Sequence, residues 1–232
     1  MSGKWLQSRI ARRLFLTRLG AGASVVGAGM LRSPAAVAQA TENDRWRPAR
    51  HEQDDWFDKI PGEHRFVFDT TTAAGMGLAL QFASNYFVAN QDAYGLKDND
   101  LAVVIVARHK ATSFAYRDAL WAKYGKQFSE QAEYTDPKTK EPPTVNVYAA
   151  PAAGSGQTGR MDALIKKGVN FAVCEMSTRR MATAIAQANG VEVDTIMKEI
   201  AANLVGNARL VSAGIVAVNR AQERGYSFVH AI

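Results

Sequence analysis

The sequence predicts one α/β domain in which helices cover both faces of a parallel, doubly wound sheet of about five strands. Short, continuously apolar runs alternate along the chain with longer stretches suited to helices. Continuous apolarity is typical of strands that are buried on both faces. Strand and helix in repeated alternation favour parallel strands joined by right-handed crossovers.

Five apolar runs are the expected strands, and five stretches between them are the expected helices. The strands are expected at residues 66–68, 101–107, 171–173, 210–211 and 228–229. The helices are expected at residues 73–90, 114–124, 160–167, 178–189 and 216–224. Ser177 or Thr178 can cap the fourth helix, and Gly190 and Gly225 follow predicted helix ends, where a left-handed residue is favoured.

Two segments fall outside this alternation. Residues 41–63 are polar and charged with isolated aromatic residues, and we interpret them as a leader that lies across the domain formed by residues 64–232. Its acidic cluster, Asp54, Asp55 and Asp58, has no further ligands at matching spacing, which favours a solvated helix face over a metal site. Residues 129–159 form a long, proline-containing loop, which predicts a functional loop, an interface element or a plain surface insertion.

The first forty residues have the features of a cleaved export signal. A basic start precedes a mild apolar run, and small residues at Ala38 and Ala40 supply the cleavage pattern. The residues Arg12, Arg13, Phe15 and Leu16 resemble the twin-arginine consensus, although Thr17 departs from it. The resemblance implies export of the folded protein by the twin-arginine translocase and a periplasmic location. An uncleaved anchor is the alternative, but a span needs about 20 apolar residues and this run is shorter.

The charge of the chain is concentrated in that signal. The formal net charge is +6, and the first forty residues hold six Lys and Arg and no Asp or Glu, so the remaining chain has a formal net charge of 0. Nucleic-acid binding requires an excess of clustered basic residues. The composition therefore predicts no nucleic-acid partner.

Common cofactor and metal motifs give weak signals. Residues 154–159 match a Gly-rich dinucleotide fingerprint, and Glu175 follows at a suitable distance, after a short strand expected at residues 145–148. The fingerprint lies late in the chain behind a proline-rich loop, which favours loop glycines over a nucleotide cradle. The four histidines of the predicted mature chain are far apart and the single Cys has no second thiol, so we expect neither metal nor cofactor.

The predicted fold brings several polar segments to one edge of the sheet. In an open parallel sheet, ligands gather outside the carboxyl ends of the strands. Residues 69–72, 108–110, 174–175 and 212–214 follow four of the expected strands. We therefore expect His109 and Cys174 to share this edge. The candidate binding residues there are Thr70, Thr71, Thr72, Ser177, Thr178, Ser212 and Gly214.

Cys174 is the candidate reactive residue because it directly precedes a predicted helix. The positive helix end and the nearby Arg179 and Arg180 favour a thiolate, whereas Glu175 opposes it. Cysteine is also among the most often buried residue types, so an inert core residue is an equal alternative.

The order of these segments resembles the DsrE/DsrF-like family. The resemblance runs from about His64 to the end of the chain and is carried by three segments and by His109 after the second strand. The three segments are 168–174, 210–215 and 220–228. It implies a flavodoxin-like fold, frequent homo-oligomers and, in sulfur-oxidation members, a Cys at the position of Cys174 that carries sulfur as a persulfide. The export signal and the run Glu175-Met176-Ser177 depart from the family pattern.

Two classes of function follow. The first is a periplasmic sulfur carrier or thiol-redox protein that acts through Cys174, with His109 as its proton partner or orienting group and a sulfur donor or acceptor protein as its partner. A buried structural His is the alternative for His109. The second is a binding or oligomeric assembly subunit without chemistry, which uses the 129–159 loop and the sheet edge.

Replacing Arg12 and Arg13 by Lys is expected to leave unprocessed precursor in the cytoplasm. The receptor recognises the guanidinium pair, and an ammonium group does not reproduce the planar fork of Arg. Cell fractionation with detection of precursor and mature forms measures the outcome. Export of mature protein at the normal rate, through the general secretion channel, would contradict the prediction.

Overall fold

Five parallel strands form the centre of the fold in the computed structural model, which describes residues 47–149 and 160–232. Their order across the sheet is β4-β3-β2-β1-β5, and every neighbouring pair is parallel. The strands are β1 (His64–Thr70), β2 (Leu101–Ala107), β3 (Asn170–Cys174), β4 (Ala208–Val211) and β5 (Ser227–Ala231). This sheet confirms the predicted α/β class and is consistent with a flavodoxin-like fold.

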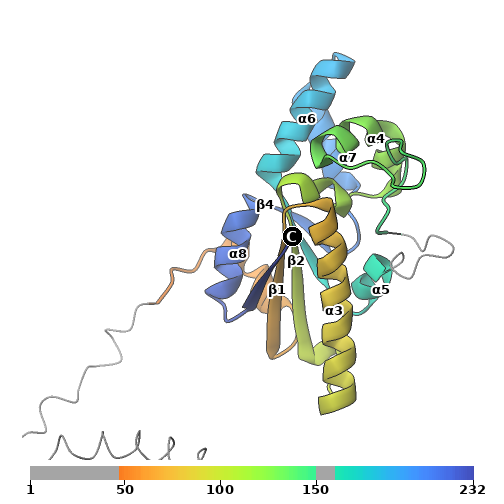
Figure 1. The fold of residues 1–232 in the computed structure, drawn as a ribbon. Helices are drawn as coiled ribbons and strands as arrows, with labels where there is room; N and C mark the ends of the chain where they lie inside the picture. Colours follow the sequence, from red (N-terminus) through yellow and green to blue (C-terminus); the bar gives the residue numbers. More distant parts are fainter. Residues whose placement is uncertain (1–46, 150–159) are drawn as a thin grey trace, which may run out of the picture. The chain divides into compact units, whose positions relative to one another are not determined.

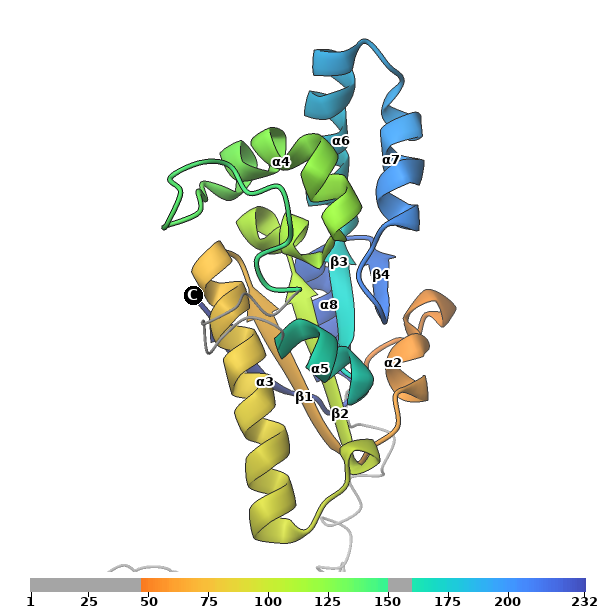
Figure 2. The same ribbon diagram turned by 90° about the vertical axis from the view of Figure 1, so that its right-hand side faces the viewer.

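The connections place helices on both faces of the sheet. From β1 to β4 the chain steps in one direction, and from β4 to β5 it returns across the sheet through α8. Because parallel crossovers are right-handed, this reversal puts α8 on the face opposite the other crossover helices. Figures 1 and 2 show α8 on one side of the strands and α3 and α5 on the other. The α-helices of the domain are α3 (Ala73–Tyr94), α4 (Asp118–Ala132), α5 (Arg160–Lys166), α6 (Glu175–Asn189), α7 (Val193–Ala202) and α8 (Gly214–Gln222).

Alternate residues of β2 enter two separate cores. Val103 and Ile105 pack with Phe68 in the core under α3, whereas Val104 and Val106 pack in the core under α8. All seven residues of β2 are buried because it lies between β1 and β3 with helices on both sides. Full burial of a Val or Ile side chain contributes about 1.5–3 kcal/mol, so this strand anchors both cores.

The structure corrects several predicted elements. The helix expected at 114–124 is divided into a 3-10 helix, η5 (His109–Ala115), and α4, because Tyr116 and Arg117 are extended. Residues 145–148 form turns and no strand. There Asn146 is buried and its side-chain Nδ2 donates hydrogen bonds to the carbonyls of Phe114 and Tyr116.

Two further differences concern the region that follows β3 and the long loop. Helix α7, which packs against α6, was not predicted from the sequence pattern. The loop expected at 129–159 begins as the last turn of α4, which ends at Ala132. Residues 150–159, which contain the whole Gly-rich fingerprint, lie outside the described residues, as do the signal residues 1–40.

The segment before β1 packs on the α8 face through short helices, η3 (Glu52–Asp54) and α2 (Trp56–Lys59). Phe57 is fully buried, and its carbonyl accepts a hydrogen bond of 2.8 Å from the hydroxyl of Tyr226. Asp54 is buried beside Arg220, and Asp58 pairs with Arg224 of the α8 region. Burial of Asp54 corrects the expected solvated helix face at that residue, whereas the Asp58 side chain remains 48% exposed beside Arg224.

None of the helices in the described ranges is long and apolar enough to cross a membrane.

Replacing Gly75 by Ala is expected to lower the free energy of unfolding by about 1–3 kcal/mol. Alanine normally stabilises a helix interior relative to glycine by about 1 kcal/mol. Here a Cβ on Gly75 would lie 2.3 Å from the carbonyl oxygen of Ala231, so α3 would have to move away from β5. Urea denaturation of the mature chain measures the change.

The control is Gly77→Ala on the same helix. Its Cβ would meet the hydroxyl end of the Tyr148 side chain at 3.1 Å, which can shift more easily than backbone. We expect a smaller loss for this variant. A stability of Gly75→Ala equal to or above that of the parent protein would show that α3 is not held against β5 by this close contact.

Candidate active site at the carboxyl ends of the strands

Four titratable side chains point to the same side of the sheet at the carboxyl ends of adjacent strands. In β3, Phe171 and Val173 enter the core under α3 and Ala172 enters the core under α8. Side chains alternate along a strand, so Cys174 faces the α8 side. The other three residues of this row are Asp69 at the end of β1, Arg108 directly after β2 and His230 in β5.

Asp69 and Arg108 form a two-point ion pair at the centre of the row. Arg108 Nε lies 2.7 Å from Asp69 Oδ1, and Arg108 Nη2 lies 2.7 Å from Asp69 Oδ2. The Asp69 side chain is 3% exposed and that of Arg108 is 24% exposed. The hydrogen bond to Asp69 raises the pKa of Arg108; burial opposes this increase, and the negative charge of Asp69 adds to it. The guanidinium therefore remains charged.

Gly214 explains why the Arg108 side chain can pass over the start of α8. A Cβ at Gly214 would come within 2.5 Å of Arg108 Cβ. Gly214, a predicted site residue, is buried, and its role in the site is to leave space for the Arg108 side chain.

Cys174 is the residue at which β3 ends and α6 begins. It is 6% exposed, and its carbonyl accepts a hydrogen bond of 2.9 Å from Thr178 Oγ1. The hydroxyls of Thr178 and Tyr116 are 2.8 Å apart, and burial raises the pKa of Tyr116 well above its ordinary value. Neutral hydroxyl groups therefore fix the backbone that carries the thiol.

The predicted threonines have separate roles at this edge. Thr70 is fully buried and donates a hydrogen bond of 2.7 Å to the carbonyl of Val106, which is a structural role. Thr71 Oγ1 lies 3.1 Å from His230 Nε2, and the same nitrogen lies 3.8 Å from Asp69 Oδ2. Thr72 caps α3, because its hydroxyl accepts a hydrogen bond of 2.9 Å from the amide of Gly75.

His109 lies at the same edge of the sheet but lines a different hollow. Its backbone has a positive φ of 55°, and its amide donates a hydrogen bond of 3.2 Å to Ser177 Oγ. Its side chain lines a pocket of about 130 Å³ together with Lys110, Gln131, Ser177 and Arg180. Arg108, one residue before His109, faces the α8 side of the sheet, as Cys174 does.

A larger pocket, of about 420 Å³, opens next to residues that neighbour Cys174, but Cys174 itself does not line it. Its lining includes Glu175, which follows Cys174 in the chain, and Val211, which pairs with Cys174 in the sheet. Ser212, a predicted site residue, also lines it. Trp56 of the N-terminal segment forms another wall, and the guanidinium of Arg209 lies 4.5 Å from the centre of a Trp56 ring.

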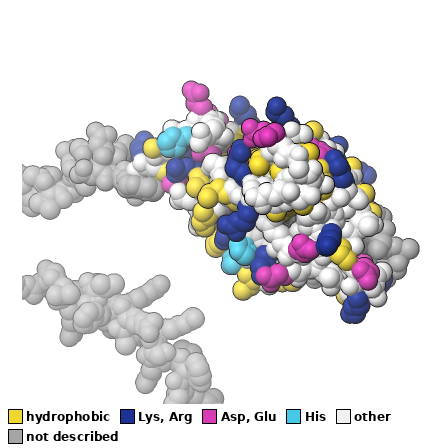
Figure 3. All heavy atoms as spheres, turned by 90° about the horizontal axis from the view of Figure 1, so that it is seen from above, with side chains coloured by type: hydrophobic (Ala, Val, Ile, Leu, Met, Phe, Trp, Pro, Cys, Tyr) yellow, Lys and Arg dark blue, Asp and Glu magenta, His cyan; other side chains and the backbone are white. Residues whose placement is uncertain are grey.

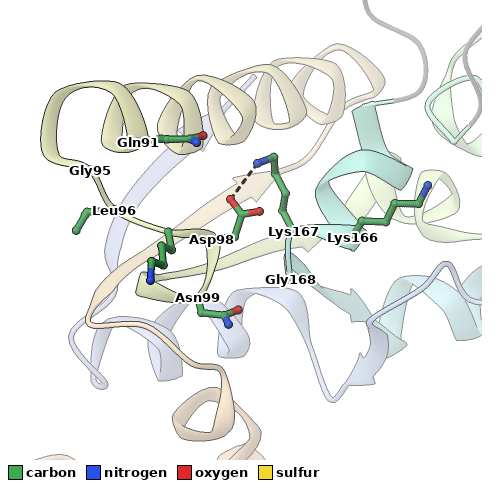
Figure 4. A pocket seen from close by; sticks show the side chains of 9 residues that line it. Gln91, Gly95, Leu96, Asp98, Asn99, Lys166, Lys167 and Gly168 are labelled. Carbon is green, nitrogen blue, oxygen red and sulfur yellow. Dashed lines mark hydrogen bonds and ion pairs between the residues drawn. The ribbon is translucent and has the colours of Figure 1, made fainter.

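A third hollow, of about 730 Å³, lies at the amino ends of β2 and β3 (Figure 4). Lys167 and Asp98 form an ion pair of 2.9 Å within it, and Gln91 and Asn99 contribute amide groups. None of the predicted site residues lines this hollow. It is therefore separate from the site at the carboxyl ends of the strands.

The surface seen from above carries charges of both signs. Lys and Arg side chains lie among Asp and Glu side chains on this face (Figure 3). Within residues 47–149 and 160–232, no group of three or more His, Cys, Asp and Glu side chains is arranged to hold a metal ion.

Sequence reasoning missed the roles of Asp69, Arg108 and His230, although it placed 69–72 and 108–110 at this edge. The signal was present in the alternation of side chains. Asp69 and Arg108 carry opposite charges at the ends of neighbouring strands, on the side of the sheet that faces α8. A buried carboxylate without a partner would cost folding free energy there. His230 lies beyond the short strand predicted at 228–229 and gave no such signal.

Comparison with known proteins leaves the functional class open. No family model matches the chain, and no curated protein sequence is detectably similar to it. A solved structure of a protein of unknown function from Methanobacterium thermoautotrophicum matches with 16% identity and a TM-score of 0.38. The match covers 72% of this chain and 99% of that chain. The order and direction of the strands, and not this similarity, define the fold.

Replacing Asp69 by Asn is expected to destabilise the protein by about 3 kcal/mol, because it leaves a partly buried guanidinium without its counter-charge. Arg108→Gln should have a similar cost, since it leaves Asp69 buried and unpaired. The double variant should be more stable than the sum of the two losses implies, by about 1 kcal/mol or more. Urea denaturation of the four proteins gives the coupling energy, and additive losses would contradict a direct pair.

Proposed function

We propose that this chain is an exported, DsrE-like protein that carries sulfur as a persulfide on Cys174. The observation that carries the proposal is the position of this thiol, which lies at the carboxyl end of β3 and at the start of α6, on the same side of the sheet as Arg108. Both the amino end of a helix and a guanidinium stabilise negative charge on sulfur. A persulfide is a stronger acid than a thiol, so the same surroundings would hold the loaded anion.

The proposed loading step is a displacement at sulfur. The Cys174 thiolate attacks the outer sulfur of a persulfide donor, R–S–SH, and forms a new S–S bond. The S–S bond of the donor breaks, and its electron pair leaves with the R–S⁻ thiolate. The products are Cys174–S–SH and R–S⁻, so the step needs no external oxidant.

The surroundings of Cys174 offer one route for the donor. The thiol itself is 6% exposed, but its chain neighbour Glu175 and its strand partner Val211 line the adjoining pocket. A donor of small cross-section can enter a hollow of about 420 Å³. The export signal at Arg12 and Arg13 supports action of the folded protein in the periplasm, and the family resemblance supports self-association.

The burial of Cys174 favours a second candidate function. An exposure of 6% is also typical of a structural cysteine in a protein core. In that case the chain would be a binding or assembly subunit, and the pocket beside Cys174 would hold a ligand without covalent chemistry.

Mature protein is expected to react with iodoacetamide at pH 7 in its native state, and to gain one sulfur atom when incubated with polysulfide. The thiol lies at the start of α6, and a hollow of about 420 Å³ that can hold a small reagent is lined by its chain neighbour Glu175. Intact-protein mass spectrometry measures both products, with the same protein in urea as the reference for full access. The control variant Cys174→Ser should give neither product.

The opposite result separates the two functions. Native protein that stays unlabelled for hours, while the denatured protein labels at once, would reject the carrier. The binding-subunit function would then stand.

A further inference from the structure

The strand β5 is an edge of the sheet without the usual protection of an edge. In the described part of the chain β5 pairs only with β1, so its outer side presents backbone N–H and C=O groups that no strand satisfies. Natural sheets protect such edges with charged side chains, proline, a bulge or a covering segment. The β5 sequence, Ser-Phe-Val-His-Ala, has no Lys, Arg, Asp, Glu or Pro, and its register with β1 is continuous.

The opposite edge of the same sheet, β4, is protected. Arg209 places a charge within this strand of four residues. Its guanidinium lies 4.5 Å from the centre of a Trp56 ring, so the N-terminal segment packs beside this strand. The two edges therefore differ, and only β5 has the composition of a strand that accepts a further strand.

Exposed apolar side chains are concentrated on β5 and on the two helices that contact it. Both α3 and α8 contact β5, from opposite faces of the sheet (Figures 1 and 2). Nine large apolar side chains are exposed in residues 47–149 and 160–232, and six of them belong to α3, to α8 or to β5 and the residue that follows it. Because exposed apolar patches mark interaction surfaces, this concentration favours an interface around β5. The six residues are Phe82, Val88, Tyr94, Ile215, Phe228 and Ile232.

The flank of α3 next to β5 is apolar and uncharged. Asp92 is the only charged residue in the 22 residues of α3, whereas a surface helix normally presents several charges to water. Gly75 marks the side that faces β5, because a Cβ there would lie 2.3 Å from the carbonyl oxygen of Ala231. Two helical turns take about seven residues, so Phe82 and Ala89, which follow Gly75 at intervals of seven, lie on the same side. Both are exposed, and they extend the β5 surface on this face of the sheet.

Phe228 extends the same surface on the other face. It pairs with Val67, which packs in the core under α8, so Phe228 also points to that side. It is 42% exposed although it lies within a strand. A five-residue strand is only about 17 Å long, and a stable dimer buries about 800 Å² on each partner. The edge alone is therefore too small, and the apolar flanks on both faces add the further area that a stable contact needs.

We infer that β5 is the dimer interface of this protein, where it pairs antiparallel with β5 of a second copy about a two-fold axis perpendicular to the sheet. A second copy fits this surface because a two-fold interface places each patch against itself, and an uncharged patch can do so without like-charge repulsion. The inference does not depend on chemistry at Cys174. It names a surface and a symmetry that the family resemblance leaves open, and it applies equally to a carrier and to a binding subunit.

This geometry determines how the helices and the candidate sites are arranged. The two α3 helices lie antiparallel on one face of the joined sheet, with Phe82 and Ala89 of each directed towards the axis. Asp92 lies in the last turn of α3, so the pair places its two copies at opposite ends. The carboxyl ends of the strands point in opposite directions in the two copies, so each Cys174 acts separately from the other.

The dimer is tested by sedimentation equilibrium of the mature protein. We expect a monomer–dimer equilibrium that Phe228→Lys and Phe82→Lys, on opposite faces of the sheet, each weaken about tenfold or more in dissociation constant. Each variant removes an apolar contact and places like charges near the two-fold axis. Val191→Lys is the matched control, because Val191 is 43% exposed and lies in the connection from α6 to α7. It should change the dissociation constant by less than about twofold.

Amide hydrogen exchange shows whether β5 is the surface involved. In the parent protein, the outward-facing amides of β5 should exchange about tenfold or more slowly above the dissociation constant than below it. In Phe82→Lys they should exchange rapidly at both concentrations. The replaced side chains are exposed, so circular dichroism and the urea midpoint of each variant should match those of the parent protein. The exchange measurement on the parent protein needs no variant.

Three results would overturn the inference: a protein that stays monomeric at its highest soluble concentration, a dimer that both lysine variants leave intact, or a dimer with unprotected β5 amides. None of them bears on persulfide loading of Cys174, which mass spectrometry measures independently. Conversely, a β5 dimer that gains no sulfur from polysulfide would reject the carrier function and leave the dimer interface in place.

Discussion

The ion pair between Asp69 and Arg108 holds together the part of the molecule on which the candidate site depends. Asp69 is almost completely buried near the end of β1, where an isolated carboxylate would be very costly. Arg108 directly follows β2, the central strand, and satisfies both carboxylate oxygens. Its guanidinium is consequently held by two hydrogen bonds, and the carbons of its side chain pass close to Gly214, the first residue of α8.

The two-residue period of a strand explains which polar groups meet at this edge. Cys174, Asp69 and His230 face the α8 side of the sheet, because the residues before them alternate between the two cores. His109 follows Arg108 and, with a positive φ, directs its side chain into the hollow next to Ser177 and Arg180. A displacement of one residue along the chain is therefore enough to assign a side chain to a different pocket.

The N-terminal segment links the second face of the sheet to the surroundings of Cys174. Phe57 is buried, and Asp54 and Asp58 lie against the arginines of the α8 region. This packing brings Trp56 to the wall of the pocket that adjoins Cys174. Residues ahead of the first strand thus complete a hollow at the carboxyl ends of the strands, although they contribute nothing to the sheet.

The sequence by itself determined the α/β class, the parallel sheet of five strands and the edge at which the polar segments gather. These features follow from apolar runs and helix-length stretches, which are local in the sequence and can be recognised without knowing which distant residues are in contact. The same reasoning identified Cys174 as the strand-end thiol and placed Gly214 at the same edge. It did not predict α7. Nor did it predict the division of the second crossover segment into η5 and α4, which depends on how Tyr116, Asn146 and Thr178 pack.

Only the tertiary structure decided which residues act together. The pairing of Asp69 with Arg108 and the contact of Thr71 with His230 join residues 39 and 159 positions apart. A shift of one residue along a strand decides whether a side chain at its end faces the Cys174 side of the sheet or the opposite side. Sequence patterns locate the ends of strands only to within a few residues. For this reason the sequence predicted the edge of the sheet, and only the fold showed that Arg108 pairs with Asp69 there.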